Sequence, residues 1–224
     1  LLTKVPLHYL WGAAHEDNKD GFDCWWAHSE EEMKRAFESF MDWTYKRWEE
    51  DKEMHVYHYG QFEITAIREL MGHFGTREKE VDELLRNEVF VDLFRVVKQS
   101  LCIGADGYGL KAIEPLFREE RGNEVASGQE STVVYELWSA ERGDTKDHLD
   151  SDYLKETWDY NKDDCVSLIA LSDWLRRIQK EENLRYVFKP SKEREVELID
   201  AISLLDELIE GLNAKEDKPH AKLL

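Results

Sequence analysis

The chain has 224 residues, and 49 acidic against 30 basic side chains give it a formal net charge of −19 at pH 7. Apolar residues make up 42% and aromatic residues 12%, so the acidity belongs to a folded domain with a core rather than to a disordered tail. The charge argues against a free-standing basic DNA clamp and against a membrane-surface binder, because both need positive faces. It leaves room for an enzyme whose carboxylates hold cations.

The cysteines and the termini narrow the cellular context. Cys24, Cys102 and Cys165 are far apart and form no C-x-x-C pair, which favours a reducing cytoplasm over a disulfide framework or a cysteine zinc site. No leader sequence and no run of about 18 apolar residues is present, so we expect no membrane partner. Because the chain begins at Leu1 rather than at Met, we expect it to be a piece of a longer protein, or to lack its first recorded residues.

The first half of the chain carries clear signals for strands and helix ends. Asp20 and Gly21 supply turn chemistry for a hairpin, Ser29 with the glutamates that follow it is a capping box, and Gly75 suits a helix end. The expected elements are strands over 7–14 and 22–28, a helix over 30–50, a strand over 55–59, helices over 62–74 and 76–86, and a strand over 89–93.

The second half is mostly helical. Its expected elements are a flexible glycine loop over 104–109, a short helix over 111–116, a polar and mobile stretch over 118–130, helices over 131–140, 151–182 and 191–212, and a disordered tail after Asn213. Early strands and late helices predict a mixed α/β sheet flanked by helices. We expect one domain over 1–182, followed by a C-terminal helical extension and tail over 183–224.

Two carboxylates lie on apolar helix faces, where a charge is costly unless a cation meets it. At 100° per residue, Asp164 shares a stripe within about 40° with Leu168, Leu171, Leu175 and Ile178. Tyr160 lies one turn before it, whereas Asp163 points about 100° away and is expected to be solvated.

Glu63 repeats this pattern on its own helix, with Ile67, Leu70 and Phe74 on the same face. Each carboxylate also has an ordinary explanation. An acid in the first turn favours the helix dipole, and Asp164 could pair with a buried Lys or Arg. Together with Tyr160 they suggest a shared cation at a strand–helix junction, and oxygen-only ligands point to Mg²⁺ or Mn²⁺ rather than zinc.

Other motifs offer no competing site. His55 and His58 face opposite sides of a strand and cannot chelate together, and no phosphate-binding glycine loop or nucleophile elbow is present. The stretch 176–194 is markedly basic. Its residues Arg176 and Arg177 are candidates for guiding a phosphate backbone, although a solvated helix end explains them equally well.

Two segments carry a family resemblance. The sequence from His58 to Glu63 resembles the second motif, H-N-x-x-F-D, of the DEDD 3′–5′ exonucleases, with Glu in place of Asp, and Tyr160 to Asp164 resembles the Y-x-x-x-D motif of the tyrosine subclass. The stretch from Leu7 to Arg176 is similar to the RNase H-like domain of a predicted RecB-type nuclease family. The segments that carry this closer match are 55–59, 89–93, 110–116 and 160–164.

The resemblance implies an RNase H-like fold with two divalent metals, Mg²⁺ or Mn²⁺, that clamp a phosphodiester. One metal would activate water and the other would stabilise the leaving oxygen. Carried over by position, Glu63 and Asp164 would be metal ligands, and Tyr160 would orient the attacking water. Asp92 and Lys111 are weaker candidates for site support or phosphate contact, and Asp92 also reads as an ordinary turn residue at a strand end.

The chain departs from the family at its start. The family's first motif, D-x-E on the opening strand, is expected just before Leu1, because residues 7–12 match the second strand. Either an upstream segment supplies it, or the chain is truncated, or catalysis has been lost; without it we expect an inactive or crippled polypeptide. Glu63 also lengthens one ligand by a methylene.

These observations predict a metal-dependent nuclease domain that cuts DNA or RNA phosphodiesters from a 3′ end within a larger nuclease or helicase protein. The main alternative is a non-catalytic RNase H-like scaffold or regulatory module. A plain helical interaction domain is the third possibility.

Overall fold

The computed structural model describes residues 5–17, 21–118, 128–141 and 144–185. The chain divides into two units, Leu1–Glu181 and Glu182–Leu224, and all described helices and strands belong to the first. The expected helix over 191–212, the tail after Asn213 and residues 119–127 of the expected mobile stretch over 118–130 lie outside the described residues. The end of that stretch was predicted wrongly, because residues 128–130 already belong to a helix.

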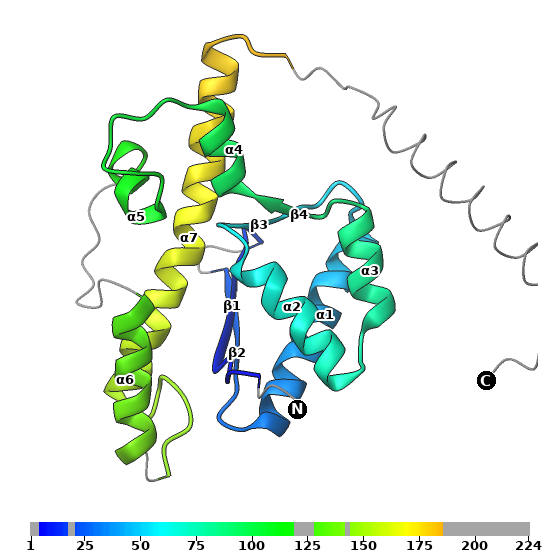
Figure 1. The fold of residues 1–224 in the computed structure, drawn as a ribbon, viewed down its shortest axis with the longest axis vertical. Coiled ribbons are helices and arrows are strands. Elements are labelled where there is room, and N and C mark those ends of the chain that lie inside the picture. The colour runs from blue at the N-terminus through cyan, green and yellow to red at the C-terminus, as the bar shows by residue number, and fades with distance from the viewer. Residues whose placement is uncertain (1–4, 18–20, 119–127, 142–143, 186–224) are drawn as a thin grey trace, which may run out of the picture. The chain divides into compact units, whose positions relative to one another are not determined.

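The described strands of the first unit all lie before Leu93, and its described elements from there on are helical (Figure 1). The elements are β1 (Leu10–Ala14), β2 (Phe22–Trp26), α1 (Glu30–Glu50), β3 (Val56–His58), α2 (Phe62–Phe74), α3 (Glu78–Arg86), β4 (Phe90–Asp92), α4 (Leu93–Ser100), α5 (Leu110–Ile113), the 3₁₀ helix η1 (Glu114–Leu116), α6 (Gly128–Glu141) and α7 (Asp152–Glu181). The predicted mixed α/β fold class is confirmed. Among the described helices, none is long and apolar enough to cross a membrane.

The strands pair in two separate sheets of two strands each. The predicted hairpin is present, with β1 antiparallel to β2 from Leu10 opposite Trp26 to Ala14 opposite Phe22. The strand–helix–strand unit places β4 parallel to β3, with His58 opposite Asp92 at the end of the pair. Among the described residues, β1 and β3 have no second strand partner, so each keeps one free edge.

A layer of three helices, α1, α2 and α3, forms the larger part of the core. Ser29 caps α1 through its hydroxyl, which accepts a hydrogen bond from the backbone N–H of Glu32 at 3.2 Å. Gly75 ends α2 in the left-handed conformation (φ 57°), which a residue without Cβ adopts freely. The side chains buried between these helices include Phe37, Met41, Ile67, Leu70, Val81 and Leu84.

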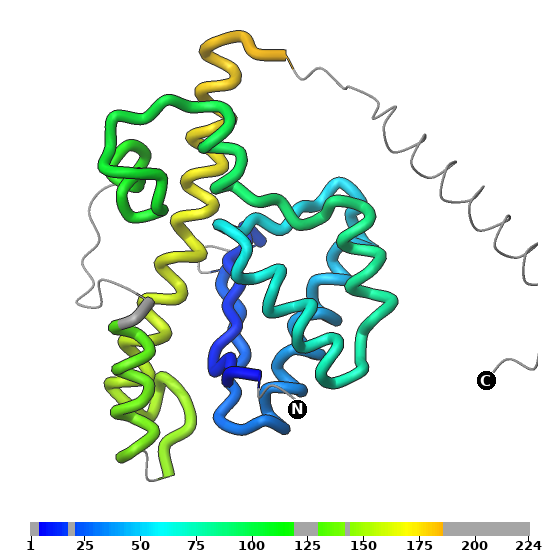
Figure 2. The backbone as a smooth tube through the Cα atoms, in the orientation of Figure 1, coloured from blue at the N-terminus to red at the C-terminus, as the bar shows by residue number. Residues whose placement is uncertain are grey.

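The long helix α7 packs against β1 of the hairpin and also against α6, as the backbone path shows (Figure 2). Gly12 on β1 makes this approach possible, because a Cβ there would lie 1.9 Å from Oδ1 of Asn161 on α7. Farther along, Leu171 of α7 is fully buried in a second cluster with Val97 and Ile113. The helix that carries Tyr160 and Asp164 is therefore fixed to the strands over several turns.

One element differs from expectation. The apolar run at 89–93 was predicted to be a strand, but the strand is only three residues long, and Leu93 already begins α4. Asp92 explains the change, because its side chain caps the helix by accepting hydrogen bonds from the N–H groups of Phe94 and Arg95. Leu93 and Val97, four residues apart, then bury one face of the helix.

Candidate active site

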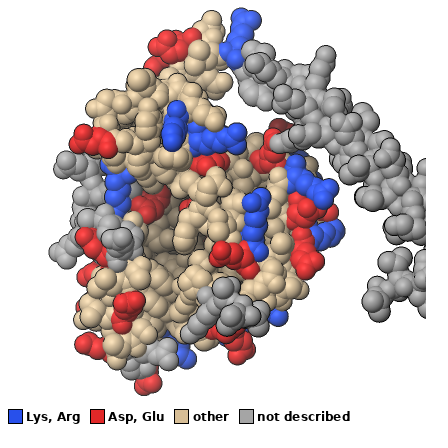
Figure 3. Space-filling model, viewed as in Figure 1, with Lys and Arg blue, Asp and Glu red and all other residues tan. Residues whose placement is uncertain are grey.

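A cleft of about 530 Å³ opens between the free edges of β1 and β3. Its walls come from both strands and from three helices, and include Gly12, Val56, Phe40, Glu63, Cys165 and Leu168. The space-filling view shows the described surface hollowed near the middle of this face, with acidic side chains close to the hollow (Figure 3). The cleft therefore combines apolar walls with carboxylates.

Glu63 lies in the first turn of α2, directly after β3. Its Oε2 atom is buried and has no hydrogen-bond partner, and Nδ1 of His58 lies 3.8 Å away. That His58 nitrogen donates instead to the carbonyl oxygen of Gly60 at 2.7 Å, and burial lowers the pKa of the imidazole. Glu63 thus faces the cleft with an unsatisfied oxygen.

The pKa of Glu63 reflects its burial and the charged groups near it. Burial raises the pKa of its carboxyl to about 7, and the negative charges of Asp92 and Asp164 add to the rise. The predicted pair, Glu63 on α2 and Asp164 on α7, is therefore close enough to interact, although 101 positions separate the two in sequence. Neighbouring carboxylates that repel one another are what a divalent cation would stabilise.

Asp92 belongs to the same group but is already committed to hydrogen bonds. Its Oδ1 accepts from the backbone N–H of Gly60 at 2.9 Å and of Phe94 at 3.0 Å, and its Oδ2 accepts from the side-chain amide of Gln61 at 3.1 Å. These contacts join the end of β4 to the β3–α2 turn. The geometry assigns Asp92 the support of the Glu63 turn, together with a helix cap.

Tyr160 and Asp164 lie one turn apart on α7, with the partly buried side chains that the apolar stripe predicted. The ammonium group of Lys111, on α5, lies 4.3 Å from the centre of the Tyr160 ring. Such a contact is attractive because the ring face is negative. Lys111 is thereby placed beside the tyrosine, one helical turn from Asp164.

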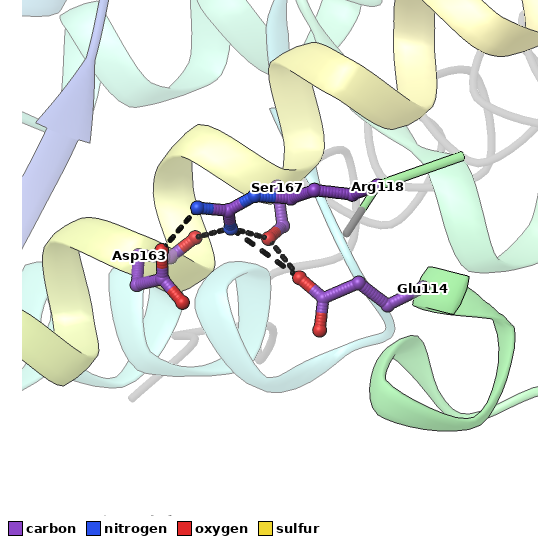
Figure 4. Close-up of polar contacts among 4 residues, drawn as sticks. All are labelled: Glu114, Arg118, Asp163 and Ser167. Atoms are coloured by element: carbon purple, nitrogen blue, oxygen red, sulfur yellow. Dashed lines mark hydrogen bonds and ion pairs between the residues drawn. The ribbon is translucent and has the colours of Figure 1, made fainter. Parts of the chain in front are cut away.

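The expectation for Asp163 was wrong. Its side chain is only 16% exposed, and its carboxylate forms an ion pair with Arg118 (Figure 4). Arg118 also donates to the Asp163 carbonyl oxygen at 3.2 Å and to the Ser167 hydroxyl at 2.6 Å. The helix wheel ignored the chain segment that follows η1, which covers this face of α7 and supplies the cation.

The basic pair at the end of α7 lies apart from the carboxylates. Arg176 is 12 residues beyond Asp164, about 18 Å along the helix. It donates to the Tyr57 hydroxyl at 2.8 Å, and its side chain is 64% exposed, while Arg177 is also exposed. Arg176 nevertheless lines the cleft, whereas Arg177 does not, so the structure brings one of the two predicted arginines to the cleft and neither of them close to Asp164.

The oxygen donors of this site are of the kind that a hard cation binds. Glu63 and Asp164 offer carboxylate oxygens, and the orphaned Oε2 of Glu63 is a ligand position without a partner. Within the described ranges, however, no three His, Cys, Asp or Glu side chains are arranged to hold a metal ion. The residues fit Mg²⁺ or Mn²⁺ as part of a ligand set that needs further oxygens.

The comparisons with known proteins decide the family. The family model described as the RNase_H superfamily matches residues 3–176, which include every residue of the candidate site described above. The chain belongs to the RNase H superfamily. Neither the curated proteins nor the solved structures provide a match.

Membership gives the architecture and the site a context. The mixed α/β structure with its long helix α7 is an RNase H-like fold. RNase H-like nucleases hydrolyse nucleic acid and generally use divalent metals, which agrees with the oxygen donors beside the cleft. The tyrosine DEDD subclass and the RecB-type family are finer assignments than this match carries.

Sequence reasoning missed Arg118 and Gln61. Arg118 lies 45 residues from its partner Asp163, and Gln61 lies 31 residues from Asp92, so neither contact has a local signature. The one available signal was the pair of consecutive aspartates at 163 and 164. Because they point to different faces of the helix, each carboxylate needs its own solvent exposure or its own partner.

Proposed function

We propose that the chain is a metal-dependent nuclease domain that hydrolyses phosphodiester bonds from the 3′ end of DNA or RNA, as part of a larger nuclease or helicase protein. The observation that carries the proposal is the approach of Glu63 and Asp164 beside the cleft, with a buried Glu63 oxygen that lacks a hydrogen bond. Superfamily membership supports the reaction class.

Each residue has a defined part in this proposal. Glu63 and Asp164 hold Mg²⁺ or Mn²⁺, and the bound cation supplies charge stabilisation and a more acidic water at the scissile phosphate. The Tyr160 hydroxyl orients the attacking water, one turn from Asp164. Lys111, beside the Tyr160 ring, contributes positive charge toward the phosphate.

The cleft supports a further part of the proposal. β1 and β3 both line it, and among the described residues each has one free edge whose backbone N–H and C=O groups are available to pair with a further strand. We propose that the strand with the D-x-E pair occupies this position. Its two carboxylates would then supply the oxygens that Glu63 and Asp164 lack as a metal site.

Cleavage of a 5′-labelled single-stranded oligonucleotide tests the function, in the polypeptide extended upstream to include the D-x-E strand. We expect products shortened one nucleotide at a time from the 3′ end, only with Mg²⁺ or Mn²⁺. Asp164→Asn should abolish the products and Tyr160→Phe should slow them at least about tenfold, as expected for a group that positions the reacting water. Asp152→Asn, at an exposed position of the same helix that does not line the cleft, is the matched control.

One observation favours a second candidate, a non-catalytic RNase H-like scaffold. In the residues that the structure describes, three metal-ligating side chains do not come together. A scaffold would bind no divalent cation at Glu63, and the extended polypeptide would leave the oligonucleotide intact.

A further inference from the structure

The segment from α5 to Arg118 contacts α7 at three successive turns around Asp164. Lys111 contacts the Tyr160 ring, Arg118 contacts Asp163, and both Arg118 and Glu114 contact the Ser167 hydroxyl (Figure 4). Glu114 is 5% exposed and Ser167 is fully buried, so this polar contact is inside the protein. Such a cluster is costly to bury and adds little stability over an apolar one.

The sequence of α7 contains an ambiguity that this cluster resolves. Asp163 and Asp164 are chemically identical neighbours, about 100° apart around the helix. A rotation of α7 by one residue would present Asp163 to the cleft in place of Asp164. Apolar packing opposes such a rotation, because it would move the fully buried Leu171 out of its cluster. A charged group that binds one aspartate specifically adds a penalty that distinguishes the two acids.

Arg118 has the contacts to make this distinction. Its guanidinium reaches the Asp163 carboxylate, the Asp163 backbone carbonyl and the Ser167 hydroxyl, which lies four residues later on the same helix face. The planar fork of an arginine fits several acceptors in one fixed orientation, which a lysine cannot do. The contact with the backbone carbonyl also ties the guanidinium to the helix itself.

We propose that Arg118 is a positioning residue that sets the rotation of α7, so that Asp164 and Tyr160, and not Asp163, face Glu63. The inference rests on the proposed function for its consequence, since the orientation matters most where Asp164 holds a cation. Arg118 acts through α7 and touches no reacting group.

Arg118→Lys tests the proposal, because it keeps the charge and loses the fork. Arg77→Lys is the matched control: Arg77 has a similar exposed fraction, 30% against 27%, and also binds an aspartate, Asp42, through two nitrogens, on the α1–α3 side. 3-Fluorotyrosine at position 160 reports the rotation of α7 by ¹⁹F NMR. Mn²⁺ affinity, measured by water proton relaxation, reports the site.

Arg118→Lys should split or shift the fluorine signal and lower the Mn²⁺ affinity about tenfold, the loss typical of groups that orient metal ligands. Arg77→Lys should lower the stability and change neither quantity. An unchanged fluorine signal in Arg118→Lys, or equal changes in both variants, would overturn the inference.

Two further outcomes are also decisive. If Arg118→Lys does not fold, Ser167→Ala replaces it, and the fluorine signal must shift there for the inference to stand. If the upstream-extended polypeptide without substitutions binds no Mn²⁺, the proposed function fails, while the fluorine signal still decides the role of Arg118.

Discussion

Two regions of the molecule differ in the groups that they bury: the helix layer of α1, α2 and α3, and the cleft between β1 and β3. In the helix layer, Phe37 and Leu70 are completely buried, Ser29 caps the start of α1, and the hydroxyl of Thr44 is a buried polar group without a hydrogen bond. Beside the cleft, a carboxylate oxygen of Glu63 is buried without a hydrogen bond, and among the described residues two strand edges lack a partner. The layer leaves a neutral hydroxyl unsatisfied, whereas the cleft leaves an acid and two strand edges unsatisfied.

That difference teaches where function resides. Buried polar groups without partners are rare in native proteins, because each costs the free energy of its lost hydration. They persist where a ligand, an ion or another strand satisfies them. The cleft is therefore the part of the described structure whose chemistry is incomplete by itself, and the predictions below contrast it with the helix layer.

The largest expected effect is the loss of a core side chain in the helix layer. Phe37→Ala should lower the free energy of unfolding by about 4 kcal/mol, because it removes a fully buried ring and leaves a cavity. Ile169→Ala, at a partly buried position on the wall of the cleft, should cost less than about 2 kcal/mol. Urea unfolding measures both. Equal losses would show that the cleft is packed as tightly as the layer.

The next effect concerns the support of the Glu63 turn. Asp92→Ala should cost about 2 kcal/mol, because it removes the α4 cap and the hydrogen bonds to the Gly60–Gln61 turn. Asp92→Asn keeps one acceptor oxygen and should lose about half as much. A loss below about 0.5 kcal/mol in Asp92→Ala would contradict the assigned role.

A smaller effect is expected from the charge of Glu63 and depends on pH. Its pKa is raised from 4.5 to about 7 in the folded state, so the folded protein binds more protons than the unfolded chain between these values. The contribution of Glu63 to stability therefore falls as pH rises through this window.

Glu63→Gln should remove this dependence. The variant should match the wild type near pH 4.5 and be more stable at pH 8 by about 1 kcal/mol, a figure reduced for solvent screening because the side chain is 43% exposed. Asp106→Asn, at an exposed loop position, should leave the pH profile unchanged. Parallel profiles for the wild type and Glu63→Gln would refute the electrostatic description of the site.

The smallest effect on stability is expected at the basic end of α7. Reversing the charges of Arg176, Arg177 and Lys180 should change the free energy of unfolding by less than about 0.5 kcal/mol, since all three are exposed. If these residues guide nucleic acid, the reversal should weaken binding and reduce its salt dependence by about three units of slope. An unchanged salt dependence would confine nucleic-acid contact to other surfaces.

Local signals predicted the elements that depend on local chemistry. Ser29 and Gly75 marked the ends of α1 and α2, and the apolar stripes beside Glu63 and Asp164 marked the buried helix faces. The approach of these two acids was implied by the family resemblance and not by either stripe alone.

Contacts between distant segments could not be predicted in this way. A helix wheel shows which residues share a face but not which segment covers it, so Asp163 was assigned to solvent although Arg118 binds it. The α4 helix was missed because Asp92 both ends a strand and caps a helix, and a short apolar run is compatible with either element.

Mn²⁺ binding to the chain tests the central claim most directly. Titration of the upstream-extended polypeptide, followed by water proton relaxation, should detect a site that is lost in both Glu63→Gln and Asp164→Asn and retained in Glu69→Gln and Asp152→Asn. Binding that is absent from the wild type, or equal in all five proteins, would contradict a cation site formed by Glu63 and Asp164.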